Sequence, residues 1–245
     1  SVTHCYSTGA VTGALFVGGL VGDNDGSIIQ CCSTGVVNGG DSVGGLVGIN
    51  SEGHVTDCYS TGRVGGNSKV GGLVGFNGNY NYSGDSPLAT VTNCYSVGAV
   101  SGNSLVGGLM GLNHGNVNVS ASFWDTPTSG QATSAGGTGK TTAEMRTAST
   151  FLEAGWDFVD EAANGTEDIW WIEEGEDYPR LWWESRPAVR LPVIELDATT
   201  FDVVIAQSVV LVDFFATWCS HCTTQAPILE EVADRLEGRA QVAKL

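Results

Sequence analysis

The sequence predicts a mainly β fold: a Gly-rich parallel β-solenoid with a Trp-rich cap, followed by a short α/β segment. Three observations predict it. A block of the form Gly-Gly-Leu-Val/Met-Gly recurs four times, most of the 35 glycines precede residue 140, and five of the seven tryptophans lie between residues 156 and 183. A repeat this short cannot bury its own apolar side chains, so neighbouring repeats are expected to stack.

Two further landmarks recur in step with the glycine block, at separations of 26, 27 and 36 residues. The blocks begin at Gly18, Gly44, Gly71 and Gly107. The matching cysteines are Cys5, Cys31, Cys58 and Cys94. The matching asparagines, expected to form a hydrogen-bonded ladder, are Asn24, Asn50, Asn77 and Asn113. The leucines of the blocks, expected to form one buried column, are Leu20, Leu46, Leu73 and Leu109. We therefore assign residues 1–122 to the solenoid, with residues 78–88 as an inserted loop.

These repeats resemble the GLUG repeats of secreted and surface-anchored bacterial proteins. The closest matches are Gly71-Gly72-Leu73-Val74-Gly75-Phe76-Asn77 and Cys58-Tyr59-Ser60-Thr61-Gly62. The resemblance covers about half of the chain. It implies an exported bacterial protein, located outside the cell, at the cell surface or in the periplasm, and it implies no activity.

The cysteine column has two interpretations. Adjacent strands lie roughly 4.8 Å apart, within the Cα separation that permits a disulfide. However, stacked parallel side chains point the same way, and Cys is among the most buried residue types, which favours free thiols that resist reagents. Cys32, beside Cys31 where other repeats have Tyr, is expected to face elsewhere.

Residues 123–184 are interpreted as an acidic, Trp-rich cap on the C-terminal end of the solenoid. From Phe151 to Glu184 there are eleven acidic residues and one basic residue, Arg180. Exposed Trp on an acidic surface also fits carbohydrate binding, but the end of a solenoid must be covered, and the cap is favoured. The capping-box spacing from Thr141 to Glu144 predicts a short helix reaching Leu152, and residues 169–183 predict a hairpin.

Residues 136–141 superficially resemble a phosphate-binding loop. Ser134 stands where that motif requires its first Gly, and no apolar strand precedes it. We therefore interpret these residues as a flexible connector. Residues 185–192 contain two prolines and are assigned to a linker.

From residue 193 the pattern changes to β-α-β-α. The apolar run from Val209 to Phe215 predicts a buried parallel strand, and Cys219-Ser220-His221-Cys222 then opens an amphipathic helix. A CxxC between a strand and a helix is typical of a redox site. Residues three apart share a helical face, so the sulfurs can join, and the helix N-terminus stabilises a thiolate at Cys219. Cys222 is then the resolving thiol. A zinc site needs a second pair of ligands, so no metal or cofactor is expected.

This segment resembles the N-terminal half of thioredoxin over residues 193–245. The match is carried by Val212-Asp213-Phe214-Phe215-Ala216-Thr217-Trp218-Cys219-Ser220-His221-Cys222, Ala226-Pro227-Ile228-Leu229 and Val242-Ala243-Lys244-Leu245. The resemblance implies that Asp213 handles the proton of Cys222, that Trp218 covers the site, and that Lys244 lies near Asp213. Ser220-His221 replaces the family's Gly-Pro, and His221 is expected to favour the thiolate and a more oxidising disulfide. The implied partners are protein thiols and disulfides.

Both ends of the sequence depart from complete modules. Thioredoxins continue with further strands, helices and a cis-proline loop, and the residues before Cys5 align with the late part of a repeat. The sequence is therefore expected to be a fragment that ends in a truncated α/β thioredoxin-like segment. In that segment the last residues form the middle strand of three, and little oxidoreductase activity is expected from it alone.

Charge and hydropathy narrow the functional classes. The net charge is −17, with 10 basic residues, so neither nucleic acid nor an anionic membrane surface is an expected partner. No apolar run approaches the length of a membrane span. The expected function is an exported modular protein that displays a thiol-disulfide oxidoreductase on a solenoid. The alternative is a non-enzymatic adhesin or structural surface protein, with cell-surface or glycan partners bound through the solenoid.

Overall fold

The computed structural model contains two compact units, residues 1–184 and residues 185–245. It describes residues 1–78, 89–115, 117–159 and 161–184, together with the strands at residues 194–195, 210–213 and 241–244. The insertion expected to form a loop lies outside the described residues from position 79 to position 88.

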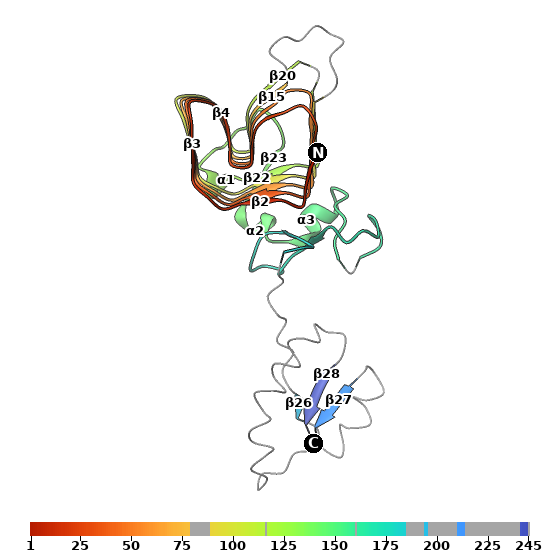
Figure 1. Cartoon of the computed structure of the whole chain (residues 1–245). Helices are drawn as coiled ribbons and strands as arrows, with labels where there is room; N and C mark the ends of the chain where they lie inside the picture. The colour runs from red at the N-terminus through yellow and green to blue at the C-terminus, as the bar shows by residue number, and fades with distance from the viewer. Residues whose placement is uncertain are drawn as a thin grey trace. The chain divides into compact units, whose positions relative to one another are not determined.

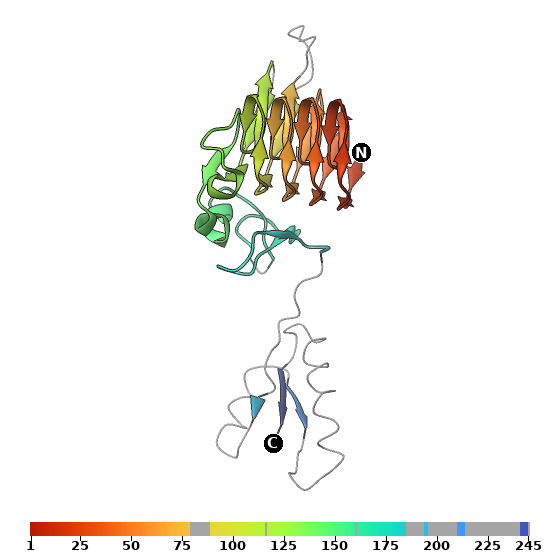
Figure 2. The same ribbon diagram turned by 90° about the vertical axis from the view of Figure 1, so that its left-hand side faces the viewer.

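The first unit is a parallel β-solenoid, and its coils contribute one short strand each to five sheets (Figures 1 and 2). The strands pair in the register of the repeats, so that Val47 lies between Val21 and Val74. The fold class expected from the sequence is therefore confirmed for this unit.

The five sheets follow one another around each coil in chain order. The first consists of β1 (Val2–Thr3), β6 (Ser27–Ile29), β11 (His54–Thr56), β16 (Ala89–Thr92) and β21 (Val117–Ser120). The second consists of β2 (Tyr6–Ser7), β7 (Cys32–Ser33), β12 (Tyr59–Ser60), β17 (Tyr95–Ser96), β22 (Phe123–Asp125) and β23 (Thr138–Lys140). The third consists of β3 (Val11–Thr12), β8 (Val37–Asn38), β13 (Val64–Gly65) and β18 (Val100–Ser101). The fourth consists of β4 (Leu15–Gly18), β9 (Asp41–Gly44), β14 (Ser68–Gly71) and β19 (Ser104–Gly107). The fifth consists of β5 (Val21–Asn24), β10 (Val47–Asn50), β15 (Val74–Gly78) and β20 (Met110–His114).

Each coil turns inward between the fourth and fifth sheets, and the glycine block forms this turn (Figure 1). The strands on its two sides approach so closely that there is no room for side chains. A Cβ atom added to Gly75 in β15 would lie 2.5 Å from the backbone of both Ser42 and Val43 in β9, one coil earlier. The recurring glycines are therefore required by packing between backbones.

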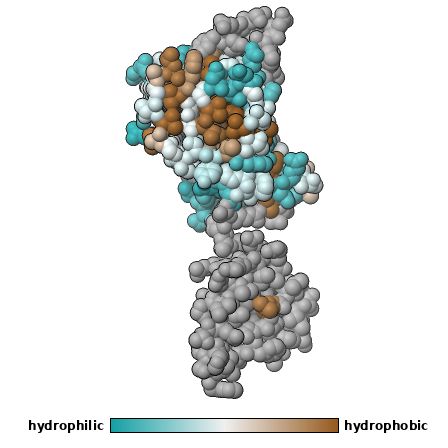
Figure 3. All heavy atoms as spheres, viewed as in Figure 1, coloured by the Kyte–Doolittle hydropathy of each residue, from teal (hydrophilic) through white to brown (hydrophobic). Residues whose placement is uncertain are grey.

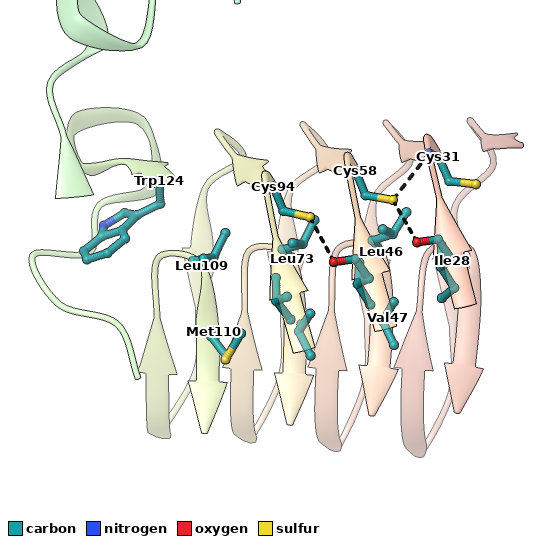
Figure 4. Packing of buried hydrophobic residues seen from close by; sticks show 13 residues of the cluster. Ile28, Cys31, Leu46, Val47, Cys58, Leu73, Cys94, Leu109, Met110 and Trp124 are labelled. Atoms are coloured by element: carbon teal, nitrogen blue, oxygen red, sulfur yellow. Dashed lines mark hydrogen bonds between the residues drawn. The ribbon is translucent and has the colours of Figure 1, made fainter. Parts of the chain in front are cut away.

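The inward turn divides the apolar interior into two lobes. One lobe contains the leucine and cysteine columns, of which Figure 4 shows a part. Leu46, Leu73 and Leu109 are completely buried, whereas Leu20 in the first coil is only partly buried. The other lobe is a valine column, formed by Val17, Val37, Val43, Val64, Val70 and Val100.

The asparagine ladder is present as expected. The Nδ2 atom of Asn24 donates to Oδ1 of Asn50 at 2.7 Å, and Nδ2 of Asn50 donates to Oδ1 of Asn77 at 2.7 Å. Asn77 continues the ladder to Asn113 at 3.0 Å. Asn50 and Asn77 are fully buried, so their side-chain oxygens depend on the neighbouring amides of the ladder for hydrogen bonds.

Residues 123–140 close the C-terminal end of the solenoid. Residues 138–140 form strand β23, which pairs with β22. The prediction of a flexible connector is therefore wrong at these three residues. The physical reason is that the edge of β22 needs a partner. The Ser134 hydroxyl accepts the backbone N–H groups of Leu109 and Met110 at 3.2 and 2.9 Å, and Trp124 packs on the end of the core.

Residues 141–184 cover a side of the solenoid rather than its end (Figures 1 and 2). The capping box at Thr141 is present, but the expected single helix is two short ones, α2 (Thr142–Met145) and α3 (Ala148–Leu152). The predicted hairpin is confirmed as antiparallel β24 (Trp170–Trp171) and β25 (Arg180–Leu181). A further short helix, α1 (Thr126–Ser129), follows β22.

The side chains of the first described coil are less buried than those of the later coils. Figure 3 looks onto the first coil, where apolar side chains gather at the surface. Tyr6 is 65% exposed and Leu15 is 63% exposed, whereas Tyr59 and Tyr95, in the same column as Tyr6, are fully buried. Among the described residues, the first coil therefore buries less of its apolar surface than the coils that follow it.

Candidate active site

The second unit has a three-stranded parallel sheet. Its strands are β26 (Ile194–Glu195), β27 (Val210–Asp213) and β28 (Gln241–Lys244), in the order β26-β28-β27. The expected central position of the last strand is therefore confirmed. The expectation that the second strand is buried is wrong at Leu211, which is 46% exposed.

Of the five candidate catalytic residues, the structure places only Asp213. It is the last residue of β27, and its Cα atom pairs in register with that of Lys244, as expected from the resemblance. Cys219, Cys222, Trp218 and His221 lie outside the described residues.

The solenoid cysteines form a second set of thiols, and all five are free. Cys31, Cys58 and Cys94 are completely buried, whereas Cys5 is only partly buried. Each buried thiol donates to a carbonyl two residues earlier: Cys58 donates to Thr56 at 3.1 Å. The prediction that these thiols are free is confirmed. Of the four cysteines in the column, Cys31, Cys58 and Cys94 are buried away from reagents, whereas Cys5 is not.

In the first three coils, the backbone N–H of each column cysteine donates to the thiol of the next: Cys5 to Cys31, and Cys31 to Cys58, the bond drawn in Figure 4. The N–H group of Cys31 donates to Sγ of Cys58 at 3.4 Å. Burial raises the pKa of Cys58, and the hydrogen bond to Cys58 together with burial raises the pKa of Cys31. At the last coil Ser122 takes the cysteine position and accepts the Cys94 N–H at 3.1 Å. Cys31 and Cys58 are poor nucleophiles because their raised pKa keeps the thiols protonated.

Cys32 faces the cap, away from the cysteine column, as expected. It belongs to the aromatic core between the solenoid side and the cap, and burial raises its pKa to about 12. In the same strand position of later coils, Tyr59 and Tyr95 stack with centroids 5.0 Å apart. The Tyr59 hydroxyl donates to Oε1 of Glu184 at 2.6 Å, and the Tyr95 hydroxyl donates to the Pro179 carbonyl at 2.6 Å.

The burial of the tryptophans in the acidic segment bears on whether this segment packs on the solenoid or binds carbohydrate. Trp156, Trp170 and Trp171 are buried, and Trp183 is partly buried against the same aromatic core. Only Trp182 is half exposed. Four of the five therefore serve packing, which favours a covering role for this segment over carbohydrate binding, although the surface covered is the side of the solenoid and not the predicted end.

Sequence reasoning missed Asp125, which ties the two parts of the cap together. It is completely buried; its Oδ1 accepts the Thr128 N–H at 2.9 Å and its Oδ2 accepts the Tyr178 hydroxyl at 2.8 Å. The helix it caps has four residues, too short to give a sequence signal. Its second bond spans 53 positions, which no local pattern predicts.

We expect native thiol labelling to follow this burial. In a Cys219→Ser/Cys222→Ser chain, Cys5 should react first, whereas Cys31, Cys32, Cys58 and Cys94 should stay unlabelled until denaturant is added. Alkylation followed by mass spectrometry of each peptide measures this order. Fast labelling of Cys58 under native conditions would contradict the stacked core.

The described residues contain no helix long and apolar enough to cross a membrane.

Comparisons with known proteins divide the chain in the same way. The GLUG motif model matches residues 39–65 and 66–101, and the thioredoxin model matches residues 192–245. Thioredoxins of Staphylococcus aureus strains N315, MW2 and USA300 are 42% identical over 55 residues, which is 22% of this chain and 53% of each thioredoxin. The chain thus spans about half the length of the curated relatives it matches. No solved structure gives a significant match. The chain is therefore modular, with GLUG motifs at residues 39–101 and a thioredoxin domain match at residues 192–245.

Proposed function

We propose that the chain belongs to an exported bacterial protein in which a GLUG solenoid displays a thiol-disulfide oxidoreductase. The observation that carries the proposal is Trp218-Cys219-Ser220-His221-Cys222, which follows a parallel strand ending in Asp213. The thioredoxin match over the same residues supports the redox chemistry. The GLUG match supports export. The burial of Cys31, Cys32, Cys58 and Cys94 is compatible with an oxidising compartment, because oxidants do not reach these four thiols.

In the proposed reaction, the Cys219 thiolate attacks one sulfur of a substrate disulfide. This forms a mixed disulfide and releases the other substrate sulfur as a thiolate. Cys222 then loses its proton to Asp213 and attacks the sulfur of Cys219. The second substrate sulfur leaves as a thiolate and the Cys219–Cys222 disulfide forms. The substrate, reduced by two electrons, takes one proton from Asp213 and one from solvent and so becomes a dithiol. The reverse sequence oxidises a substrate dithiol. Trp218 covers the site, and His221 favours the thiolate form of Cys219.

Trapping of the mixed disulfide tests this proposal. In the full-length protein, Cys222→Ser should accumulate covalent complexes linked through Cys219, because the resolving attack is lost. Non-reducing gels and mass spectrometry of the linked peptide measure them. Cys58→Ser is the matched control, since it also removes one thiol, and it should trap nothing. If Cys222→Ser gives no Cys219-linked species, the enzymatic proposal fails.

The second candidate is a non-enzymatic adhesin or structural surface protein. It is favoured by one observation: residues 1–184 form a compact unit with its own core, distinct from the redox segment. A Cys219→Ser/Cys222→Ser protein separates the two candidates. If the surface role is the main one, this variant keeps its binding to cells, glycans or other copies of itself while all thiol exchange is lost.

A further inference from the structure

One corner of the solenoid encloses a carboxyl group. The corner lies between the first and second sheets, and five coils each have a non-glycine residue there in the left-handed region, with φ between 46° and 52°. These residues are His4, Gln30, Asp57, Asn93 and Ala121. Asp57 is 5% exposed, whereas His4 is exposed and Gln30 is half-buried. An acidic side chain is therefore buried at a corner where the other four coils have none.

The cap covers Asp57 with a buried tryptophan. Nε1 of Trp170 donates to Oδ1 of Asp57 at 3.3 Å, and Trp170 is completely buried. The Trp170 ring packs against aromatic side chains of both parts, with its centroid 4.6 Å from that of Trp156 in the cap and 6.4 Å from that of Tyr59 in the solenoid. The bond between Asp57 and Trp170 therefore joins the cap to the solenoid inside the protein.

The charged groups that face Asp57 from the cap are also acidic. Asp157 and Glu167 lie close enough for their charges to act on the Asp57 carboxyl group. Trp170 contacts both aspartates, because its N–H donates to the Asp157 carbonyl at 3.0 Å. Asp157 is 7% exposed; its Oδ2 accepts the Glu167 N–H at 2.9 Å, and its buried Oδ1 has no partner among the described residues. We call Asp57, Trp170, Asp157 and Glu167 the cap junction.

Among the described residues, no ion pair neutralises the carboxyl groups of the cap junction. On the solenoid side, the neighbouring corner residues Gln30 and Asn93 are neutral. Burial raises the pKa of Asp57 despite hydrogen bonds from Asn93 and Trp170, and the facing charges of the cap raise it further. Ionisation of Asp57 therefore costs free energy while the cap is closed, and this cost is relieved when the cap moves away and water reaches the carboxylate.

We propose that the cap junction is a proton-sensitive latch, which holds the cap tightly when Asp57 is protonated and loosely when Asp57 is ionised. A group whose pKa is raised in the closed state binds its proton more tightly there than in the open state. The closed junction is therefore most stable at acidic pH, below the ordinary Asp value of about 3.9, and it loses stability as pH rises through the raised pKa of Asp57.

Labelling of Cys32 measures the opening of this latch. Cys32 is 3% exposed and lies in the aromatic core under the cap, so a reagent reaches it when the cap opens. The Cys219→Ser/Cys222→Ser chain, in urea below its unfolding midpoint, is treated with 4,4′-dithiodipyridine between pH 4 and pH 8. Mass spectrometry of each peptide gives the labelling rate of each cysteine.

Asp57→Asn in the same chain provides the comparison. Asn keeps the Oδ1 acceptor, and Asn93 has the same backbone conformation in the next coil, so the variant fits this corner. The ratio of the Cys32 rates in the two chains removes the reagent's own pH dependence, because both chains are measured at the same pH. We expect the rate with Asp57 to rise relative to the rate with Asn, by about tenfold for each unit by which the closed junction raises the pKa of Asp57.

Three controls separate the latch from general unfolding. Cys58 is completely buried in the other lobe, so its ratio should stay constant with pH. Asp157→Asn removes a facing charge and should slow Cys32 labelling at pH 8, whereas Glu176→Gln removes an exposed charge of the cap and should change nothing. If Asp57→Asn does not fold, the comparison of Asp157→Asn with Glu176→Gln decides. The proposal is overturned if the Cys32 ratio is constant from pH 4 to pH 8, or if Cys58 follows Cys32, which would indicate that the whole unit opens.

Discussion

Substitution of Gly75 by Ala is expected to destabilise the solenoid by about 3 kcal/mol, at the upper end for overpacked cores. The added Cβ atom would lie 2.5 Å from the backbone of Ser42 and Val43. Backbone atoms of a paired strand cannot rotate away as a flexible side chain does, so the fourth and fifth sheets must separate. Chemical denaturation of the first unit, followed by its tryptophan fluorescence, measures the change.

Gly26→Ala is the matched control for this substitution. Gly26 also lies in the solenoid, but an added Cβ atom there has no neighbour within 4 Å. Its effect should stay within about 0.5 kcal/mol, as for ordinary surface sites. Equal losses at Gly26 and Gly75 would mean that glycine is needed for chain flexibility rather than for close approach of the sheets.

Asn50→Asp is expected to cost about 3 to 5 kcal/mol at neutral pH, because it places an uncompensated charge in the buried ladder. The new carboxylate cannot donate to Oδ1 of Asn77 or to the carbonyl of Gly53, both of which Asn50 serves. Burial raises the pKa of such a carboxyl above its unfolded value near 3.9. The folded state then binds more protons than the unfolded state. The cost should therefore be smallest below about pH 4 and should grow as pH rises toward the folded pKa.

Asn103→Asp provides the control for the ladder. Nδ2 of Asn103 donates to Oδ1 of Asn67 at 2.8 Å, but this pair is exposed. Its replacement should change stability little and with little pH dependence. Denaturation midpoints of both variants between pH 4 and pH 8 test the expectation. A flat profile for Asn50→Asp would show that water reaches the ladder.

The parts of the fold that repeat could be predicted from the sequence, because each recurring residue reports one position in every coil. The ladder of Asn50 and the column of Cys58 are examples. The side-on packing of the cap could not be predicted, since it depends on single long-range contacts such as Tyr59 with Glu184. The inward turn was also missed, because a Gly that permits a bend and a Gly that permits close approach look alike in sequence.

The candidate redox site was found from local sequence alone, because strand, CxxC and helix are contiguous. The central position of β28 followed from the resemblance, and the register of Asp213 with Lys244 agrees with it. The roles of Cys219, Cys222, Trp218 and His221 stay predictions.

The most direct test of the modular account is a redox titration of all seven cysteines in the full-length protein. The protein is equilibrated in thiol-disulfide buffers of graded potential, and each cysteine's oxidation state is read by differential alkylation and mass spectrometry. We expect Cys219 and Cys222 to change together in one two-electron transition, while Cys31, Cys32, Cys58 and Cys94 remain thiols throughout. Disulfides among the solenoid cysteines, or a Cys219–Cys222 pair that never oxidises, would contradict the account.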